Sequence, residues 1–220
     1  MNHQKRKVPK ALYLVVIAVI TLATLSQWVI WKYGNIKNNT QIADDGIAAT
    51  ILYQPAPITS FRLSNQKGSE FNQDSFLNHW SLLTFGYTNC PDICPTTLQT
   101  LNHVDKLLKE SNYPIQPQVV FISLDPERDN VEKLAEYIPW FNEDFIGLTG
   151  SIEQVEVLTK MLGIINKKRD TEPRSNNYQI DHTVAIMMID SKAQLRALSS
   201  APHNAQTIAE DFIKITQKFN

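Results

Sequence analysis

The chain has 220 residues with 21 basic and 22 acidic side chains, so its net charge is −1. This balance excludes a strongly basic nucleic-acid-binding surface, and no basic stripe follows the N-terminal residues. The length suits one domain of ordinary size after any targeting segment, and two cysteines are too few for a disulfide framework.

Residues 11–31 form an almost wholly apolar run without a charged side chain, long enough to span a bilayer. We predict a cytoplasmic head at 1–10 and a transmembrane anchor at 11–31. Four basic side chains precede the run, and the positive-inside bias places the rest of the chain outside. The expected location is the bacterial inner membrane, crossed once, with the C-terminal domain in the periplasm. A cleaved signal peptide is the alternative, although the run is long and lacks an obvious cleavage site.

Residues 32–54, polar and asparagine-rich over most of their length, are predicted to be a tether, and residues 55–220 to be the folded domain. In that domain, short runs at 57–63 and 69–71 flank a turn at 65–68 and predict a hairpin. Residues 81–87 predict a buried strand, 96–109 a helix and 119–123 a second strand. These three elements form a β-α-β unit, which implies a parallel pair of strands.

The C-terminal half predicts helices that alternate with strands. The expected elements are a helix at 131–138 ended by Pro139, a strand at 145–148, a helix from 151 to about 162, a loop at 167–179, strands at 183–189 and 195–198, and a helix at 205–219. Ser151 and Gln154 have the spacing of a capping box at the start of their helix. The whole order predicts an α/β thioredoxin-like fold, with helices on both faces of a mixed sheet.

Cys90 and Cys94, the only cysteines, lie where a predicted strand passes into a predicted helix. We expect them on one face of the helix, under the positive end of its dipole, which lowers the pKa of a thiol. Such a pair can exchange a disulfide or bind a soft ion such as Cu(I), and an added imidazole also suits Cu(II). Redox thioredoxins use C-x-x-C, whereas the extra spacer here lets both sulfurs face a shared ligand. A purely structural disulfide over so short a loop would constrain little chain entropy.

A third ligand is sought among five histidines. His182 is the candidate, because the loop that enters the strand at 183–189 is expected to lie against the cysteine loop. The other histidines are expected in the cytoplasmic head, on the surface, on the opposite helix face and in a solvated loop: His3, His79, His103 and His203. Met187 and Met188 are soft alternatives, but their place within a strand is more typical of the core.

Four motifs occur in order along the chain: residues 86–95 (GYTNCPDICP), 123–129 (SLDPERD), 147–150 (GLTG) and 181–183 (DHT). Over residues 55–217 the chain resembles the Sco/SenC family of copper-binding assembly proteins. The resemblance implies a thioredoxin-like fold and copper, as Cu(I), Cu(II) or both, held by Cys90, Cys94 and His182. Asn89 stands where relatives often have histidine, and Thr183 where serine is common. Neither position is a metal ligand in the family pattern, so these departures concern the fine properties of the copper site and not copper binding itself.

The resemblance also implies a role in maturing the binuclear copper centre of cytochrome c oxidase. The expected partners are the copper-binding subunit of that oxidase and either a thiol reductant or an upstream copper donor. Asp92 and Asp125 are candidates for residues that do not bind the metal themselves but orient the side chains that do.

Two alternatives concern the same cysteines. In one, Cys90 and Cys94 are a redox-active pair that forms a disulfide, and the protein is a membrane-anchored thiol-disulfide oxidoreductase that reduces the target's cysteines. A copper chaperone rather than an enzyme is favoured, but the sequence leaves the choice open. A peroxidase of the peroxiredoxin type is disfavoured, because it needs a threonine three residues before the reactive cysteine and Thr88 is two before Cys90.

Overall fold

The computed structural model describes residues 21, 23–27, 46–170 and 178–220. The predicted head and most of the anchor at 11–31 and of the tether lie outside these residues and stay predictions. Within the described ranges, no helix is both long and apolar enough to cross a membrane. Residues 46–170 and 178–220 belong to one compact unit.

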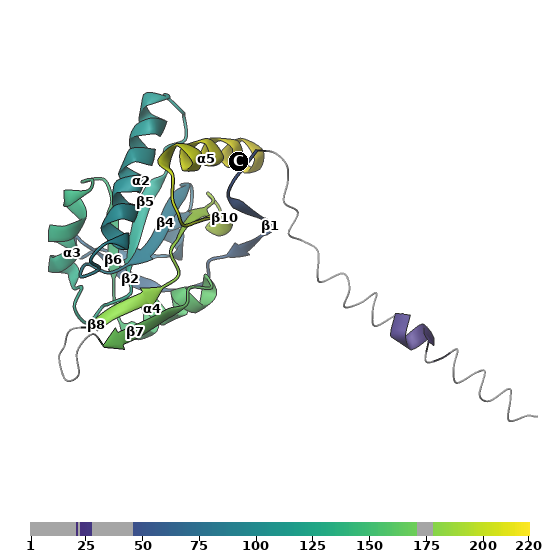
Figure 1. Ribbon diagram of the computed structural model, residues 1–220, viewed down its shortest axis with the longest axis horizontal. Helices are drawn as coiled ribbons and strands as arrows, with labels where there is room; N and C mark the ends of the chain where they lie inside the picture. Colours follow the sequence, from purple (N-terminus) through teal and green to yellow (C-terminus); the bar gives the residue numbers. More distant parts are fainter. Residues whose placement is uncertain (1–20, 22, 28–45, 171–177) are drawn as a thin grey trace, which may run out of the picture. The chain divides into compact units, whose positions relative to one another are not determined.

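The centre of this unit is a mixed sheet of eight strands in the order β1-β10-β9-β4-β5-β6-β2-β3 (Figure 1). The strands are β1 Thr50–Pro57, β2 Arg62–Asn65, β3 Glu70–Asn72, β4 Ser81–Gly86, β5 Gln118–Ser123, β6 Ile146–Thr149, β9 Ala185–Ile189 and β10 Gln194–Ser200. β5 runs parallel to both β4 and β6, and the other neighbours are antiparallel. The predicted β-α-β unit and the thioredoxin-like arrangement are therefore confirmed.

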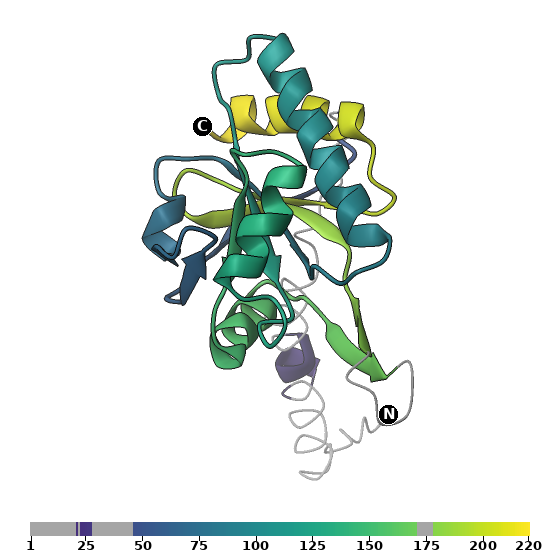
Figure 2. The ribbon, with the colours of Figure 1, turned by 90° about the vertical axis from the view of Figure 1, so that its left-hand side faces the viewer.

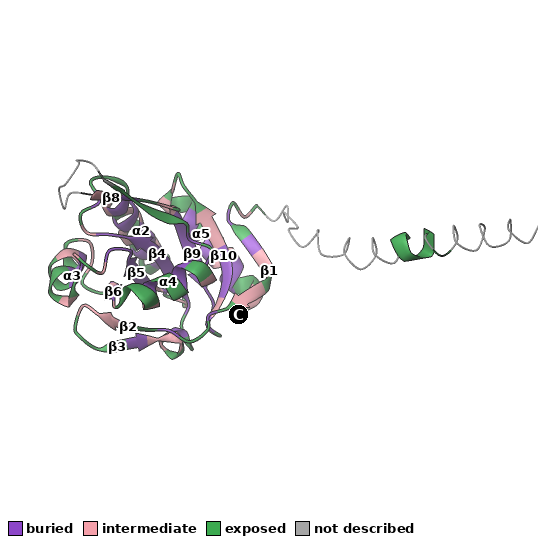
Figure 3. Cartoon of the chain, turned by 90° about the horizontal axis from the view of Figure 1, so that it is seen from below, coloured by how far each residue is buried: buried purple, intermediate pink, exposed green. Residues whose placement is uncertain are grey.

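Helices cover both faces of the sheet, as Figures 1 and 2 show. They are α2 Ile93–Glu110, α3 Val131–Tyr137, α4 Ile152–Met161 and α5 Ala205–Phe219, with 3-10 turns η1 Gln73–Phe76 and η2 Ile138–Trp140. In β4, Leu82 packs with the apolar side chains of α2, α3 and α5, while Leu83 packs with those of α4. Successive strand residues point to opposite faces, so one short strand serves two cores. Figure 3 shows these central strands buried and the outer helix faces exposed.

Two helix boundaries differ from those predicted. α2 begins at Ile93 rather than at residue 96, so Cys94 and Pro95 lie in its first turn. α3 ends at Tyr137, one residue earlier than predicted, and Pro139 lies inside the η2 turn that follows, where its fixed φ suits a tight turn.

The capping box predicted for α4 is half formed. The Ser151 hydroxyl accepts a hydrogen bond from the backbone N–H of Gln154, as expected. The Gln154 side chain instead accepts from the backbone N–H of Arg62 at 2.7 Å. It therefore joins α4 to β2 rather than closing the cap.

β1 begins at Thr50, inside the stretch predicted to be a tether. It pairs antiparallel with β10 at the edge of the sheet. Residues 50–54 therefore belong to the sheet. Their mixture of apolar and polar side chains suits an edge strand, but such a pattern resembles a linker in the sequence alone.

The loop predicted at 167–179 is wrong at both of its described ends. β7 Asn166–Asp170 pairs with β8 Tyr178–His182 in a separate two-stranded ribbon, which projects from the rest of the unit in Figure 2. A ribbon outside the main core needs no buried alternation of apolar residues, so its polar sequence resembled a loop. β9 accordingly begins at Ala185 and not at Thr183.

Candidate metal site

The cysteines lie in the connection from β4 to α2. Cys90 precedes the helix, and Cys94 is the second residue of its first turn. The sequence predicted that both cysteines would stack on one helix face. They do not, because Cys90 lies outside the helix. The backbone N–H of Cys94 points at the Cys90 sulfur across 3.4 Å. Both are buried free thiols.

Gly86, the last residue of β4, lets the start of α2 approach the sheet. A Cβ atom at Gly86 would lie 2.9 Å from the Cys94 Sγ and 2.7 Å from a ring carbon of Phe121. Any side chain would thus displace the thiol or the ring. Gly86 opens the first family motif, but no local pattern in the sequence indicated this packing role.

His182 is the last residue of β8, so a strand of the ribbon carries it rather than a free loop. Its Nε2 lies 3.7 Å from the Cys94 Sγ, although 88 residues separate the two. Its Nδ1 lies 3.0 Å from the backbone oxygen of Thr183. Because a carbonyl oxygen only accepts, Nδ1 is the donor in this contact, and Nε2 is the ring nitrogen that faces the thiol.

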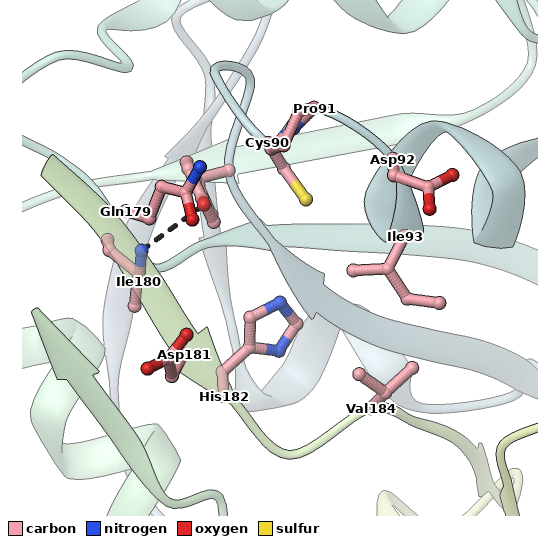
Figure 4. A pocket seen from close by; sticks show the side chains of 10 residues that line it. Cys90, Pro91, Asp92, Ile93, Gln179, Ile180, Asp181, His182 and Val184 are labelled. Atoms are coloured by element: carbon pink, nitrogen blue, oxygen red, sulfur yellow. Dashed lines mark hydrogen bonds between the residues drawn. The ribbon is translucent and has the colours of Figure 1, made fainter. Parts of the chain in front are cut away.

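The site opens to solvent through a cleft of about 380 Å³ between the cysteine loop and β8. Figure 4 shows the Cys90 sulfur and the His182 imidazole facing this cleft from opposite sides. The residues that line it are Tyr87, Cys90, Pro91, Asp92, Ile93, Gln179, Ile180, Asp181, His182 and Val184. Access for a partner is therefore through the face that carries both Cys90 and His182.

The two thiols differ in acidity. Hydrogen bonds from the Cys94 thiol, and to a smaller extent from His182 and two backbone N–H groups, overcome the effect of burial and lower the pKa of Cys90 to about 4. The same bond, in which Cys94 is the donor, and its deeper burial raise the pKa of Cys94 far above its ordinary value. The prediction that both pKa values are lowered is wrong for Cys94, because only one sulfur of a hydrogen-bonded pair can accept.

The other histidines lie elsewhere. His79 and His103 are exposed, as expected, and His3 lies outside the described residues. His203 was expected to be solvated, but both of its ring nitrogens are buried and, in the described part of the chain, have no hydrogen-bond partner. Burial lowers its pKa.

The structure also shows where the other candidate residues lie, namely the two methionines and the two acidic residues. Met187 and Met188 are core residues of β9. Asp92 lines the cleft and makes no side-chain cap for α2. Asp125 is fully buried, and its carboxylate accepts from Arg128 and Tyr178.

The cysteine loop is held in place by Asp129, which is fully buried. Its carboxylate accepts from the Thr88 backbone N–H at 2.9 Å and from the Thr88 hydroxyl at 2.5 Å. The Ser123 hydroxyl donates to the same carboxylate at 2.6 Å. The second family motif, 123–129, thus anchors the loop two residues before Cys90.

Of the three expected ligands, Cys90 and His182 line the cleft and Cys94 lies behind them, and the three do not form a closed coordination sphere. Across residues 46–170 and 178–220, no group of three or more His, Cys, Asp or Glu side chains is arranged to hold a metal ion. Cys94 contacts His182, and Cys90 is joined to Cys94 by hydrogen bonding. The donor types suit a soft ion, and each ligand comes from a supported backbone segment.

Comparison with known proteins gives several close matches. The family model described as SCO1/SenC matches residues 52–217. An SCO2-like protein of Rickettsia prowazekii is 38% identical over 134 residues, covering 61% of this chain and 64% of that protein. The mitochondrial SCO1 homolog 1 of Arabidopsis thaliana is 30% identical over 160 residues, covering 72% of this chain and 47% of that protein. The matched region is thus less than two thirds of the length of each relative.

Solved structures agree with this match. Arabidopsis thaliana ScoI with copper bound has a TM-score of 0.69 and 29% identity, covering 74% of this chain and all of that one. Yeast Sco1 with copper bound has a TM-score of 0.69 and 28% identity, covering 76% of this chain and 91% of that one. A family model that spans most of the sequence, and structures that share the fold, lead to one conclusion: the chain belongs to the SCO1/SenC family.

Proposed function

We propose that this protein is a copper metallochaperone that delivers copper to, or prepares, the binuclear copper centre of cytochrome c oxidase during assembly of that enzyme. The observation that carries the proposal is the contact of 3.7 Å between Cys94 Sγ and His182 Nε2, beside a cleft that Cys90 also lines. Two thiolates and an imidazole form a soft donor set suited to copper. The copper-bound structures of Arabidopsis thaliana ScoI and yeast Sco1 support copper as the cargo.

Copper uptake requires different changes at the three ligands. Cys90 is ready as a thiolate, and His182 presents its Nε2 to the thiols and binds copper through it when that nitrogen carries no proton. Cys94 must lose its proton, so binding releases a proton and is favoured by rising pH. Because the cleft leaves Cys90 and His182 accessible from one side, a soft ligand of the target can replace them one at a time.

The test is anaerobic Cu(I) and Cu(II) titration of the full-length protein in detergent, followed by transfer to an apo oxidase copper domain. Cys90→Ser and Cys94→Ser should abolish tight binding of both ions, because each removes a thiolate. His182→Ala should chiefly weaken Cu(II), for which imidazole is a preferred ligand. His103→Ala, which changes an exposed histidine of α2, is the control. Unchanged copper stoichiometry in both cysteine variants would contradict the proposal.

A thiol-disulfide reductase is the second candidate, and the unequal acidity of the cysteines favours it. The Cys90 thiolate would attack one sulfur of a target disulfide, which breaks the target S–S bond, forms a mixed disulfide and releases the other target sulfur as a thiolate. Cys94, after losing its proton, would then displace the target thiolate, so that two electrons pass to the target and Cys90 and Cys94 become a disulfide. In this case His182→Ala should retain reductase activity while copper delivery is lost.

We further propose that residues 11–31 anchor the protein and that the folded domain faces the periplasm. The apolar run and the basic residues before it support this topology. Protease treatment of intact spheroplasts should degrade the C-terminal domain. Protection of that domain until the membrane is lysed would reverse the proposed orientation.

A further inference from the structure

Arg128 lies between the two segments that carry the expected ligands, and neither the comparisons nor the proposed function gives it a role. Its guanidinium carbon lies 3.6 Å from the centre of the Tyr178 ring in β8 and 6.0 Å from that of Tyr87 in the cysteine loop. Its side chain is only 20% exposed. A cation that is stacked on a ring and largely withdrawn from water holds that ring firmly.

Polar contacts reinforce this stacking. The Nη1 of Arg128 donates to the backbone oxygen of Tyr178 at 3.2 Å, and its Nε donates to Asp125. The other oxygen of Asp125 accepts from the Tyr178 hydroxyl at 2.6 Å. Arg128 and Asp125 therefore hold both the backbone and the side chain of Tyr178, four residues before His182 on the same strand.

Tyr87 joins the cysteine loop to this strand at a second point. Its hydroxyl accepts from the backbone N–H of Ile180 at 3.2 Å. Its ring meets the His182 ring edge to face, with centres 6.4 Å apart. Because the β7–β8 ribbon lies outside the main sheet, these contacts, with the buried side chain of Ile180 and the Lys168–Glu127 ion pair, hold β8 against the rest of the domain.

We propose that Arg128 is a positioning residue that docks β8 against the cysteine loop and thereby sets the approach of His182 to a bound copper ion. The inference rests on the proposed function. Cu(I) is held well by two thiolates alone, whereas Cu(II) gains more from an imidazole. Loss of Arg128 should therefore weaken Cu(II) binding selectively, unlike a change that simply unfolds the site.

The experiment compares Arg128→Met with Arg169→Met in the full-length protein. Arg169 is a matched control, because it is an exposed arginine of the same ribbon that pairs with Asp181 at 3.2 Å. We expect Arg128→Met to lower Cu(II) affinity about 10- to 100-fold and to change the thiolate-to-Cu(II) absorption and EPR signal. Cu(I) affinity should stay within about threefold, and Arg169→Met should leave both affinities within about threefold.

A readout without copper separates docking from other effects. The backbone N–H of Ile180, bonded to Tyr87, should exchange with solvent faster in copper-free Arg128→Met than in Arg169→Met. Equal exchange, an unchanged Cu(II) affinity or an equal loss of both ions would overturn the inference.

A second, milder variant tests the same inference if Arg128→Met does not fold. Tyr178→Phe removes only the hydroxyl that donates to Asp125. A smaller but still Cu(II)-selective loss would support the inference, and no change in the ratio of the two affinities would overturn it. If the unaltered protein binds neither ion, the proposed function fails instead.

Discussion

Gly86 and Cys94 approach so closely that a Cβ atom on the glycine would lie 2.9 Å from the cysteine sulfur. Gly86→Ala should therefore displace Cys94 and the facing ring of Phe121, and destabilise the domain by about 1–3 kcal/mol. Urea unfolding of the protein measures this change, and copper titration should show weaker binding.

A double-mutant cycle assigns the effect of Gly86→Ala to this contact. In a Cys94→Ala background the sulfur is absent, so Gly86→Ala should destabilise less than it does in the unaltered protein. Part of the effect should remain because of the contact with Phe121. Strictly additive changes in the free energy of unfolding would show that the two residues do not crowd each other.

Cys90 should react as a thiolate at unusually low pH. Its pKa of about 4 lies below that of an ordinary thiol, so the thiolate fraction falls only as the pH drops through about 4. Alkylation of Cys90 by iodoacetamide, followed by mass spectrometry, should stay nearly constant from about pH 8 to about pH 5. Cys94, whose pKa is raised, should react little over that range.

Cys94→Ala provides the control for this pH dependence. It removes the strongest hydrogen bond to the Cys90 sulfur, so the pKa of Cys90 should rise and its alkylation should begin to slow at a higher pH. A midpoint near the ordinary value of about 8.5 in the unaltered protein would contradict the proposed thiolate.

The turn between β9 and β10 depends on a buried ion pair. Asp190 accepts from Arg196 Nη2 at 2.7 Å, and their side chains are only 2% and 10% exposed. Asp190 also accepts from the backbone N–H groups of Lys192 and Gln194. Asp190→Ala leaves the arginine charge unpaired and should destabilise the domain by about 3–5 kcal/mol, measured by denaturant unfolding.

An exposed ion pair serves as the comparison. Glu156 and Lys160 pair at 2.8 Å on the surface of α4, with side chains 55% and 77% exposed. Glu156→Ala should change the free energy of unfolding by less than about 1 kcal/mol. Similar losses for Asp190→Ala and Glu156→Ala would show that burial of the first pair does not matter.

Asp211 in α5 holds the start of the folded domain. Its carboxylate accepts from the backbone N–H groups of Ala48 and Ala49 at 3.0 and 2.7 Å. Asp211→Ala leaves these donors without that acceptor and should destabilise the domain by about 1–3 kcal/mol. Both N–H groups should exchange with solvent faster, as measured by hydrogen exchange. Glu210→Ala, at an exposed neighbour, should leave their exchange unchanged.

Hydrophobic periodicity in the sequence predicted the elements that form the core. The strand at 81–87 and the helix at 205–219 match β4 and α5, because their apolar side chains repeat with the period of the element that buries them. β1 and the β7–β8 ribbon were missed because strands at an edge, or outside the main sheet, bury few side chains and so lack this signal.

The sequence by itself determined which side chains are the candidates for the chemistry, since Cys90 and Cys94 are the only cysteines and the motif around His182 stands out. Only the tertiary structure decided how they meet. The 3.7 Å between Cys94 and His182 depends on a ribbon docked by Arg128, and the unequal acidity of the thiols depends on which sulfur donates to the other. Contacts between residues 88 positions apart, and the direction of one hydrogen bond, arise from packing and leave no trace in local sequence patterns.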